Sequence, residues 1–204
     1  GERSRLARRV GVHRLESTLF LNTGSGFEAV ALPREAQWSP GFGVVVADLD
    51  GDGRDDVFLG QNLFGLVPDL PRQDAGTGLL LRGDGTGGLA AVAPRESGIQ
   101  VWGEQRGVAV GDYDQDGRPD LVVAQNGAPT RLFHNVGGRP GLRVRLVGSD
   151  GNPMALGAQI RPVLSGKPGP VREVQAGSGY GSQNSAVGVM GPREDVTAVW
   201  VRWP

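Results

Sequence analysis

Two similar acidic loops constrain this chain more than any other feature of its sequence. They read DLDGDGRDD at residues 48–56 and DYDQDGRPD at residues 112–120. Each loop has aspartate at positions one, three, five and nine, and glycine at position six. Alternate spacing lets a tightly turning backbone direct several carboxylate oxygens at one centre, and the glycine permits the sharp turn. Many hard oxygen ligands in a flexible loop favour Ca²⁺ over Mg²⁺ or zinc.

The loops therefore predict two calcium sites. The aspartates contribute side-chain oxygens, and the arginine at position seven contributes only its backbone carbonyl. Four carboxylates this close together repel one another strongly when no cation is present. The alternative is a pair of solvated acidic turns. The predicted ligand sets are Asp48, Asp50, Asp52, Arg54 and Asp56 in the first loop, and Asp112, Asp114, Asp116, Arg118 and Asp120 in the second.

These loops differ from EF-hands. An EF-hand requires a bidentate Glu at position twelve and a helix on each side. Position twelve is Leu59 in one loop and Val123 in the other. The flanking segments are apolar and rich in β-branched residues, which predicts strand, calcium turn, strand. These segments are GVVVA at 43–47, VFL at 57–59, GVAVG at 107–111 and LVVA at 121–124.

Composition agrees with a β-rich globular protein. The chain holds 35 glycines and 14 prolines with a hydrophobic fraction of 38%, which fits many short strands joined by turns. A net charge of −1 argues against a nucleic-acid partner. There is no cysteine, hence no disulfide and no thiolate metal site. No apolar stretch approaches the ~18 residues that span a bilayer. The first residue is not Met, so we expect a processed or truncated product.

An internal repeat organises the first two thirds of the chain. The acidic loops begin 64 residues apart (112 − 48), and each is preceded by a strand and a glycine turn, at 19–26 and 79–85. A partial third copy, LFHNVG, lies at 132–137. Each unit thus reads as four antiparallel strands with the calcium turn between the last two, the pattern of a propeller blade. Residues 63–78 are interpreted as the connection between blades.

These motifs resemble known families. The acidic loop followed by an aliphatic strand is similar to the FG-GAP (VCBS-type) repeat of integrin-α-like β-propellers. GAQI at 157–160, REV at 172–174, GSGYGSQNS at 177–185 and VWVRWP at 199–204 resemble the ASPIC/UnbV domain of the cartilage acidic protein family. The resemblance covers roughly residues 19–204. It implies a calcium-binding propeller in a secreted, cell-surface or periplasmic setting, and little about activity.

We therefore expect an all-β chain with a basic N-terminal segment at 1–18, about two blades at 19–138, and a small antiparallel β domain at 139–204. Closed propellers have about four to eight blades, so two blades leave the ring incomplete. The chain then belongs to a longer protein, partner chains complete the ring, or the blades pack on the C-terminal domain. We favour a piece of a larger assembly.

Other features have a structural and a functional interpretation. The tripeptide Arg82-Gly-Asp84 is an integrin-recognition sequence, but the repeat places it in an ordinary glycine turn. His134 aligns with Leu21 and Leu81 of the other strand copies, which favours packing over metal binding or catalysis. The arginines at positions 3, 5, 8, 9 and 14 are interpreted as a solvated tail.

A polar cluster lies near the C-terminus, where either turn capping or a small glycan- or protein-binding surface would use such side chains. Its members are Tyr180, Ser182, Gln183, Asn184 and Ser185.

The expected function is a non-catalytic, calcium-stabilised extracellular module that presents its loops to a protein or a glycan. One alternative is a subunit of an extracellular filament or surface complex whose neighbours close the ring. Another is a domain of a glycan-acting enzyme, although no nucleophile–base or histidine–carboxylate constellation is evident.

Overall fold

The computed structural model describes residues 11–204, and these are nearly all β, in several antiparallel sheets, as predicted. The chain divides into two compact units, residues 1–32 and 33–204. Most of the predicted basic segment lies outside the described residues. Within the first unit, β1 (Thr18–Asn22) and β2 (Phe27–Ala31) form an antiparallel hairpin.

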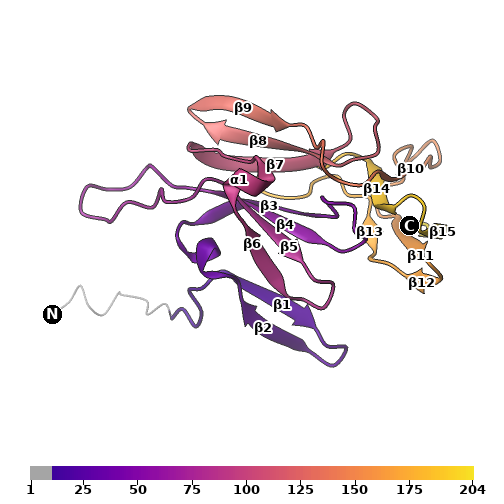
Figure 1. Ribbon diagram of the computed structural model, residues 1–204, viewed down its shortest axis with the longest axis horizontal. Coiled ribbons are helices and arrows are strands. Elements are labelled where there is room, and N and C mark those ends of the chain that lie inside the picture. Colours follow the sequence, from indigo (N-terminus) through magenta and orange to yellow (C-terminus); the bar gives the residue numbers. More distant parts are fainter. Residues whose placement is uncertain (1–10) are drawn as a thin grey trace. The chain divides into compact units, whose positions relative to one another are not determined.

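The second unit begins with a four-stranded antiparallel sheet of blade type (Figure 1). Its strands pair in chain order: β3 (Gly41–Ala47), β4 (Asp56–Gln61), β5 (Leu79–Gly83) and β6 (Leu89–Val92). From Gly43 to Ala47 the residues of β3 alternate, with Val45 buried and its two neighbours exposed. This alternation is the expected result of period-two side-chain direction on a strand with one buried face.

A second sheet holds three strands, β7 (Glu104–Gly111), β8 (Asp120–Asn126) and β9 (Ala128–Phe133), again antiparallel and in chain order. A short turn of 3-10 helix (Arg34–Gln37) precedes β3, and the four-residue α1 (Pro94–Ser97) lies between the two sheets in sequence. The four-strand blade predicted from the repeat is therefore complete once and partial once. The residues that the structure describes contain no closed ring.

The predicted boundaries of the blade unit require correction. Residues 63–78 do not connect two blades, because they belong to the segment that joins β4 to β5, which pair within one sheet. The hairpin that carries the acidic loop comes first in each sheet, and it is followed by the hairpin β5–β6 in the first sheet and by the single strand β9 in the second. The connection between sheets is instead the segment 93–103, which carries α1.

The main core lies between the two sheets. Phe58 and Val123 are fully buried there, and Val108 is 1% exposed. Ile99 and Val101, from the connection between the sheets, complete this cluster. Strand β7 packs against β3 and β4 (Figure 1). The acidic loops lie at the ends of strands whose other residues fill this core, so the packing fixes where both loops begin and end.

Residues 141–202 add two further sheets, in agreement with the strands expected there. In one, β10 (Gly141–Arg145) pairs with β14 (Val187–Pro192). In the other, β11 (Gln159–Leu164) pairs with β15 (Val196–Arg202). The short strands Lys167–Pro168 (β12) and Arg172–Glu173 (β13) also pair with β11.

A second core joins these sheets. Ile160 and Met190 are buried in it, and Val199 packs against it. Val201, on the same face of β15 as Val199, is partly buried, whereas Trp203, beyond the end of the strand, is 53% exposed.

The C-terminal sheets contact the blades directly. Arg172 of β13 forms an ion pair with Asp55 in the first acidic loop. The Ser185 backbone N–H donates to the carbonyl of Val110 at 2.9 Å. The Val110 N–H in turn donates to Asn184 Oδ1 at 3.0 Å, so this segment occupies part of the edge of β7. None of the helices within residues 11–204 has the length and apolar character needed to cross a bilayer.

Candidate metal centre

The first acidic loop, residues 48–56, joins β3 to β4 and brings three of its aspartates together. Carboxylate oxygens of Asp48, Asp50 and Asp56 all lie within 4.8 Å of one another. Asp48 and Asp56 are buried, at 6% and 2% exposed. The Asp48 carboxylate accepts the Gly53 backbone N–H at 2.9 Å, which closes the turn.

The second loop, residues 112–120, joins β7 to β8 and repeats this arrangement. Oxygens of Asp112, Asp114 and Asp120 lie within 4.8 Å of one another. The Asp112 carboxylate accepts the Gly117 N–H at 3.0 Å, the counterpart of the Asp48 contact. Gly117 and Gly53 both have φ of +87°, a conformation that favours glycine. The turn role predicted for position six is confirmed.

The aspartates at position five lie outside these clusters. Asp52 accepts the Arg54 backbone N–H at 2.9 Å and forms an ion pair with the same guanidinium. In the second loop, Asp116 accepts the Arg118 backbone N–H at 2.8 Å and forms an ion pair with the Arg118 guanidinium. In each loop, three of the four aspartates at positions one, three, five and nine thus converge, and the one at position five faces the arginine at position seven.

Burial shapes the electrostatics of both clusters. Burial raises the pKa of Asp48 from 3.8 to about 6, against the lowering effect of the Gly53 hydrogen bond. Burial likewise raises the pKa of Asp56. Asp112 is 1% exposed at its side chain, and its Oδ1 has no hydrogen-bond partner. A buried charged oxygen is costly unless it is paired or bound to a metal, so this donor set fits a hard cation.

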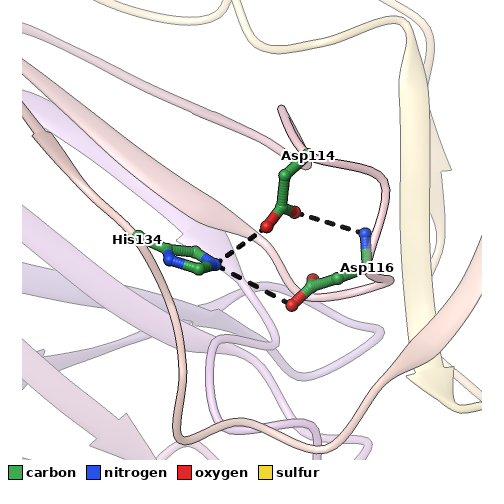
Figure 2. Close-up of side chains that lie close together, drawn as sticks. All are labelled: Asp114, Asp116 and His134. Atoms are coloured by element: carbon green, nitrogen blue, oxygen red, sulfur yellow. Dashed lines mark hydrogen bonds and ion pairs between the residues drawn. The ribbon is translucent and has the colours of Figure 1, made fainter.

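Basic side chains approach each loop from other elements. Arg143 Nε of β10 lies 2.7 Å from Asp112 Oδ2, so one oxygen of that buried carboxylate is paired. Arg82 Nε of β5 lies 3.0 Å from Asp50 Oδ2. His134, which directly follows β9, places Nε2 2.9 Å from Asp114 Oδ2 (Figure 2).

The packing role expected for His134 is wrong. Its side chain is 42% exposed and faces two aspartates of the second loop. Phe133 pairs with Leu121 in the second sheet, and Leu81 pairs with Val57 in the first. Val57 lies 64 residues before Leu121 and is its counterpart in the repeat, so Leu81 corresponds to Phe133. His134 is therefore equivalent to Arg82, one residue beyond the position assigned from sequence. The sequence pattern "LFHN" gave no signal of this shift.

One segment, residues 135–141, contacts both acidic loops. Asn135 Nδ2 donates to the carbonyls of Leu49 in the first loop, at 2.7 Å, and Pro119 in the second, at 3.1 Å. The Asn135 backbone N–H donates to Asp120 Oδ1 at 2.8 Å. Further along, the backbone N–H groups of 139 and 141 donate to the carbonyls of residues 50 and 117, at 2.9 and 2.7 Å. Nothing in the sequence indicated this role, because none of the residues in the segment is acidic.

Two other sequence features have structural roles. In the tripeptide, Arg82 is engaged with Asp50, the Gly83 N–H donates to Asp56 at 3.0 Å, and Asp84 caps the Thr86 N–H at 2.7 Å. Arg82 and Gly83 end β5 and Asp84 begins the turn, so only the last residue of the tripeptide lies in the expected glycine turn.

The polar cluster near the C-terminus also caps backbone groups. Asn184 accepts the Val110 N–H, as described above, and Ser185 Oγ accepts the Val187 N–H at 3.1 Å. The turn-capping interpretation thus accounts for these two members.

Comparison with known proteins agrees with the repeat. No curated protein matches the chain. The family model of the FG-GAP repeat matches residues 106–139, which span β7, the second acidic loop, β8, β9 and the start of the segment that contacts both loops. FG-GAP repeats are protein-interaction modules, typically extracellular. Residues 106–139 of this chain are therefore an FG-GAP repeat.

Proposed function

We propose that this protein is a non-catalytic, calcium-stabilised interaction module of the extracellular space. The observation that carries the calcium assignment is the buried Asp112 Oδ1, which lacks a hydrogen-bond partner in a loop where three carboxylates converge. A solvated acidic turn would leave its oxygens exposed to water. In the first loop the aspartates at the same three positions also converge, so we propose a calcium site there as well.

The aspartates at positions one, three and nine form the core of each proposed ligand set, and those at position five and the position-seven carbonyls complete it. Calcium supplies the positive charge that lets these carboxylates stay ionised at low exposure. The full sets are Asp48, Asp50, Asp52, Arg54 and Asp56, and Asp112, Asp114, Asp116, Arg118 and Asp120.

Calcium acts in this proposal by linkage to folding. The ion binds the folded loops and not the unfolded chain, so at 100 times Kd each site adds about 2.7 kcal/mol to the free energy of unfolding. Both loops border the core between the sheets, so their stabilisation holds the two sheets in register. The rigid sheets then present their connecting loops to a protein or a glycan at the cell surface.

The connection at 62–78 is the best-suited surface for such contacts. Phe64, Val67 and Leu70 are 52%, 61% and 52% exposed there. Exposed apolar side chains gathered on one loop are typical of interaction sites. Glu104 accepts the Phe64 N–H at 2.9 Å, and this hydrogen bond fixes one end of the loop to β7.

A subunit of a filament or surface complex is the second candidate. The second sheet has three strands where the first has four, and its outer strand β9 is almost entirely exposed. Val122 and Leu132, on the face turned away from the core, are 36% and 51% exposed. A neighbouring sheet would cover both residues, and the mass of the protein in solution distinguishes this candidate from a monomeric module.

The calcium proposal is tested by isothermal titration calorimetry of the metal-free chain, together with thermal unfolding in calcium and in EDTA. Two calcium ions per chain and a melting temperature several degrees higher in calcium are expected. Unchanged unfolding in EDTA, with no binding heat, would contradict the assignment. Incubation with a polysaccharide panel is expected to release no reducing ends or unsaturated products.

A further inference from the structure

The second acidic loop carries a group that the first loop lacks. His134 Nε2 lies 2.9 Å from Asp114 Oδ2 and 3.9 Å from Asp116 Oδ2, and the imidazole points into the space between the two carboxylates (Figure 2). The Tyr113 ring meets the imidazole edge to face at 5.7 Å between centroids. This contact restricts rotation of the imidazole while its Nε2 faces the loop.

These three groups have the composition of a transition-metal site. One imidazole nitrogen and two carboxylate oxygens all lie within 4.8 Å of one another. Metal–ligand distances of about 2.0–2.2 Å in tetrahedral zinc sites place neighbouring ligand atoms roughly 3.3 Å apart. The two observed separations from Nε2 fall on either side of that value. Imidazole suits zinc and its neighbours in the first transition row, whereas Ca²⁺ prefers oxygen ligands.

The repeat offers an internal comparison. The equivalent position in the first loop is Arg82, whose guanidinium pairs with Asp50 and has no lone pair for a metal. The first loop therefore retains an oxygen-only set, and only the second has the mixed set. Arg118 also pairs with Asp116, so a metal competes with that guanidinium for one carboxylate.

We propose that Asp114, Asp116 and His134 form a binding site for a borderline divalent metal of the Zn²⁺ class, with water completing the coordination. The site goes beyond the calcium proposal, because it uses His134 and excludes the buried Asp112 and Asp120. It shares Asp114 and Asp116 with the proposed calcium ligands, so zinc and calcium compete at the second loop and not at the first.

The test is a zinc titration of the folded, metal-free chain by calorimetry and by NMR of the histidine side chains. The chain has two histidines, so His13 is the matched control. We expect one zinc equivalent in the wild type, with selective shifts of the His134 imidazole signals. His134→Ala should weaken zinc binding by at least about tenfold, the scale on which even outer-shell partners act. His13→Ala and Arg82→Ala should leave it unchanged.

Absence of zinc binding, or zinc binding that survives His134→Ala, overturns the proposal. His134→Arg, which copies the first loop, supplies a second variant that keeps a cationic partner for Asp114, and it should also abolish zinc binding. Calcium titration of the same samples separates the two proposals. Zinc binding through His134 without any calcium binding refutes only the calcium assignment, and the converse refutes only the zinc site.

Discussion

Arg82 and His134 occupy the same place in the two sheets. Each comes directly after the residue that pairs with the start of the strand behind the acidic loop, Leu81 opposite Val57 and Phe133 opposite Leu121. Each places a side-chain nitrogen about 3 Å from the position-three aspartate. The residue after each donates its backbone N–H to the position-nine aspartate, at 3.0 Å from Gly83 and 2.8 Å from Asn135. The backbone around the two loops is therefore arranged in the same way, whereas the side chain next to the position-three aspartate is a guanidinium in one and an imidazole in the other.

Removing Arg82 should strengthen calcium binding at the first loop. Its guanidinium neutralises Asp50 in the metal-free protein, so calcium must compete with it. Because exposed ion pairs contribute about 0.2–1 kcal/mol, Arg82→Ala should tighten this site by up to roughly fivefold in calorimetry. The exposed Arg95, in α1, is the matched control and should have no effect. Weaker binding in Arg82→Ala would contradict this competition.

Loss of a position-three aspartate should remove one calcium site and its share of stability. Asp50→Ala and Asp114→Ala are each expected to bind one calcium ion per chain and to lose about half of the calcium-dependent rise in melting temperature. Asp84→Ala is the control, because Asp84 caps a turn outside both clusters. It should lower the melting temperature equally in calcium and in EDTA.

The metal-free protein should lose stability as the pH rises from about 4 to about 6. Because the pKa of Asp48 is raised from 3.8 to about 6, the folded state holds a proton that the unfolded chain has already released in this window. The raised pKa of Asp56 acts in the same direction. At about 1.36 kcal/mol per pKa unit, Asp48 alone contributes at most about 3 kcal/mol.

Chemical denaturation in EDTA across this pH range measures the effect. Asp48→Asn, which cannot titrate, should flatten the pH dependence relative to the wild type. In saturating calcium the wild type should show the opposite slope, because the ion binds the ionised carboxylate. A wild-type curve in EDTA that matches that of Asp48→Asn would show that burial does not raise the pKa of this group.

Truncating Asn135 should loosen both acidic loops at once. Asn135→Ala removes the donor that satisfies the carbonyls of Leu49 and Pro119, and an unsatisfied buried partner costs about 1–3 kcal/mol. Urea denaturation should show this loss, and amide hydrogen exchange should rise in both loops. Faster exchange confined to the second loop would contradict a bridging role for Asn135.

The ion pair between Arg172 and Asp55 should couple the C-terminal sheets to the first loop. Both side chains are about 30% exposed, at 28% and 31%. A double-mutant cycle with Arg172→Ala and Asp55→Ala should give a coupling energy of about 0.5–1 kcal/mol. Arg161, an exposed arginine of β11, offers the matched cycle with Asp55, for which no coupling is expected.

The sequence predicted the strands and turns, because these depend on residues that are close together along the chain. The alternation in segments such as 43–47 located the strands, and glycine at position six located the turns. It did not predict which hairpins share a sheet, because the apolar patterns of β4 and β5 are the same whether these strands pair or belong to different blades. That choice depends on long-range packing around Phe58 and Val123, which no local pattern encodes.

The same reason explains the residues missed at the candidate site. His134, Asn135 and Arg143 reach the second loop only because of the pairing of β9 and the return of β10. Counting from a shared leucine shifted His134 by one position, and on a strand such a shift exchanges a buried face for an exposed one. The clustered aspartates could be predicted, because the residues of each cluster lie within one loop of nine residues.

The hydrogen bonds between Val110 and the 184–185 segment give the second sheet a direction of growth. The protein's own C-terminal region occupies the border of that sheet at Val110, so an incoming strand cannot pair with that residue. The opposite border, along β9, is almost entirely exposed. An assembly built from this chain would therefore extend more readily from the β9 side.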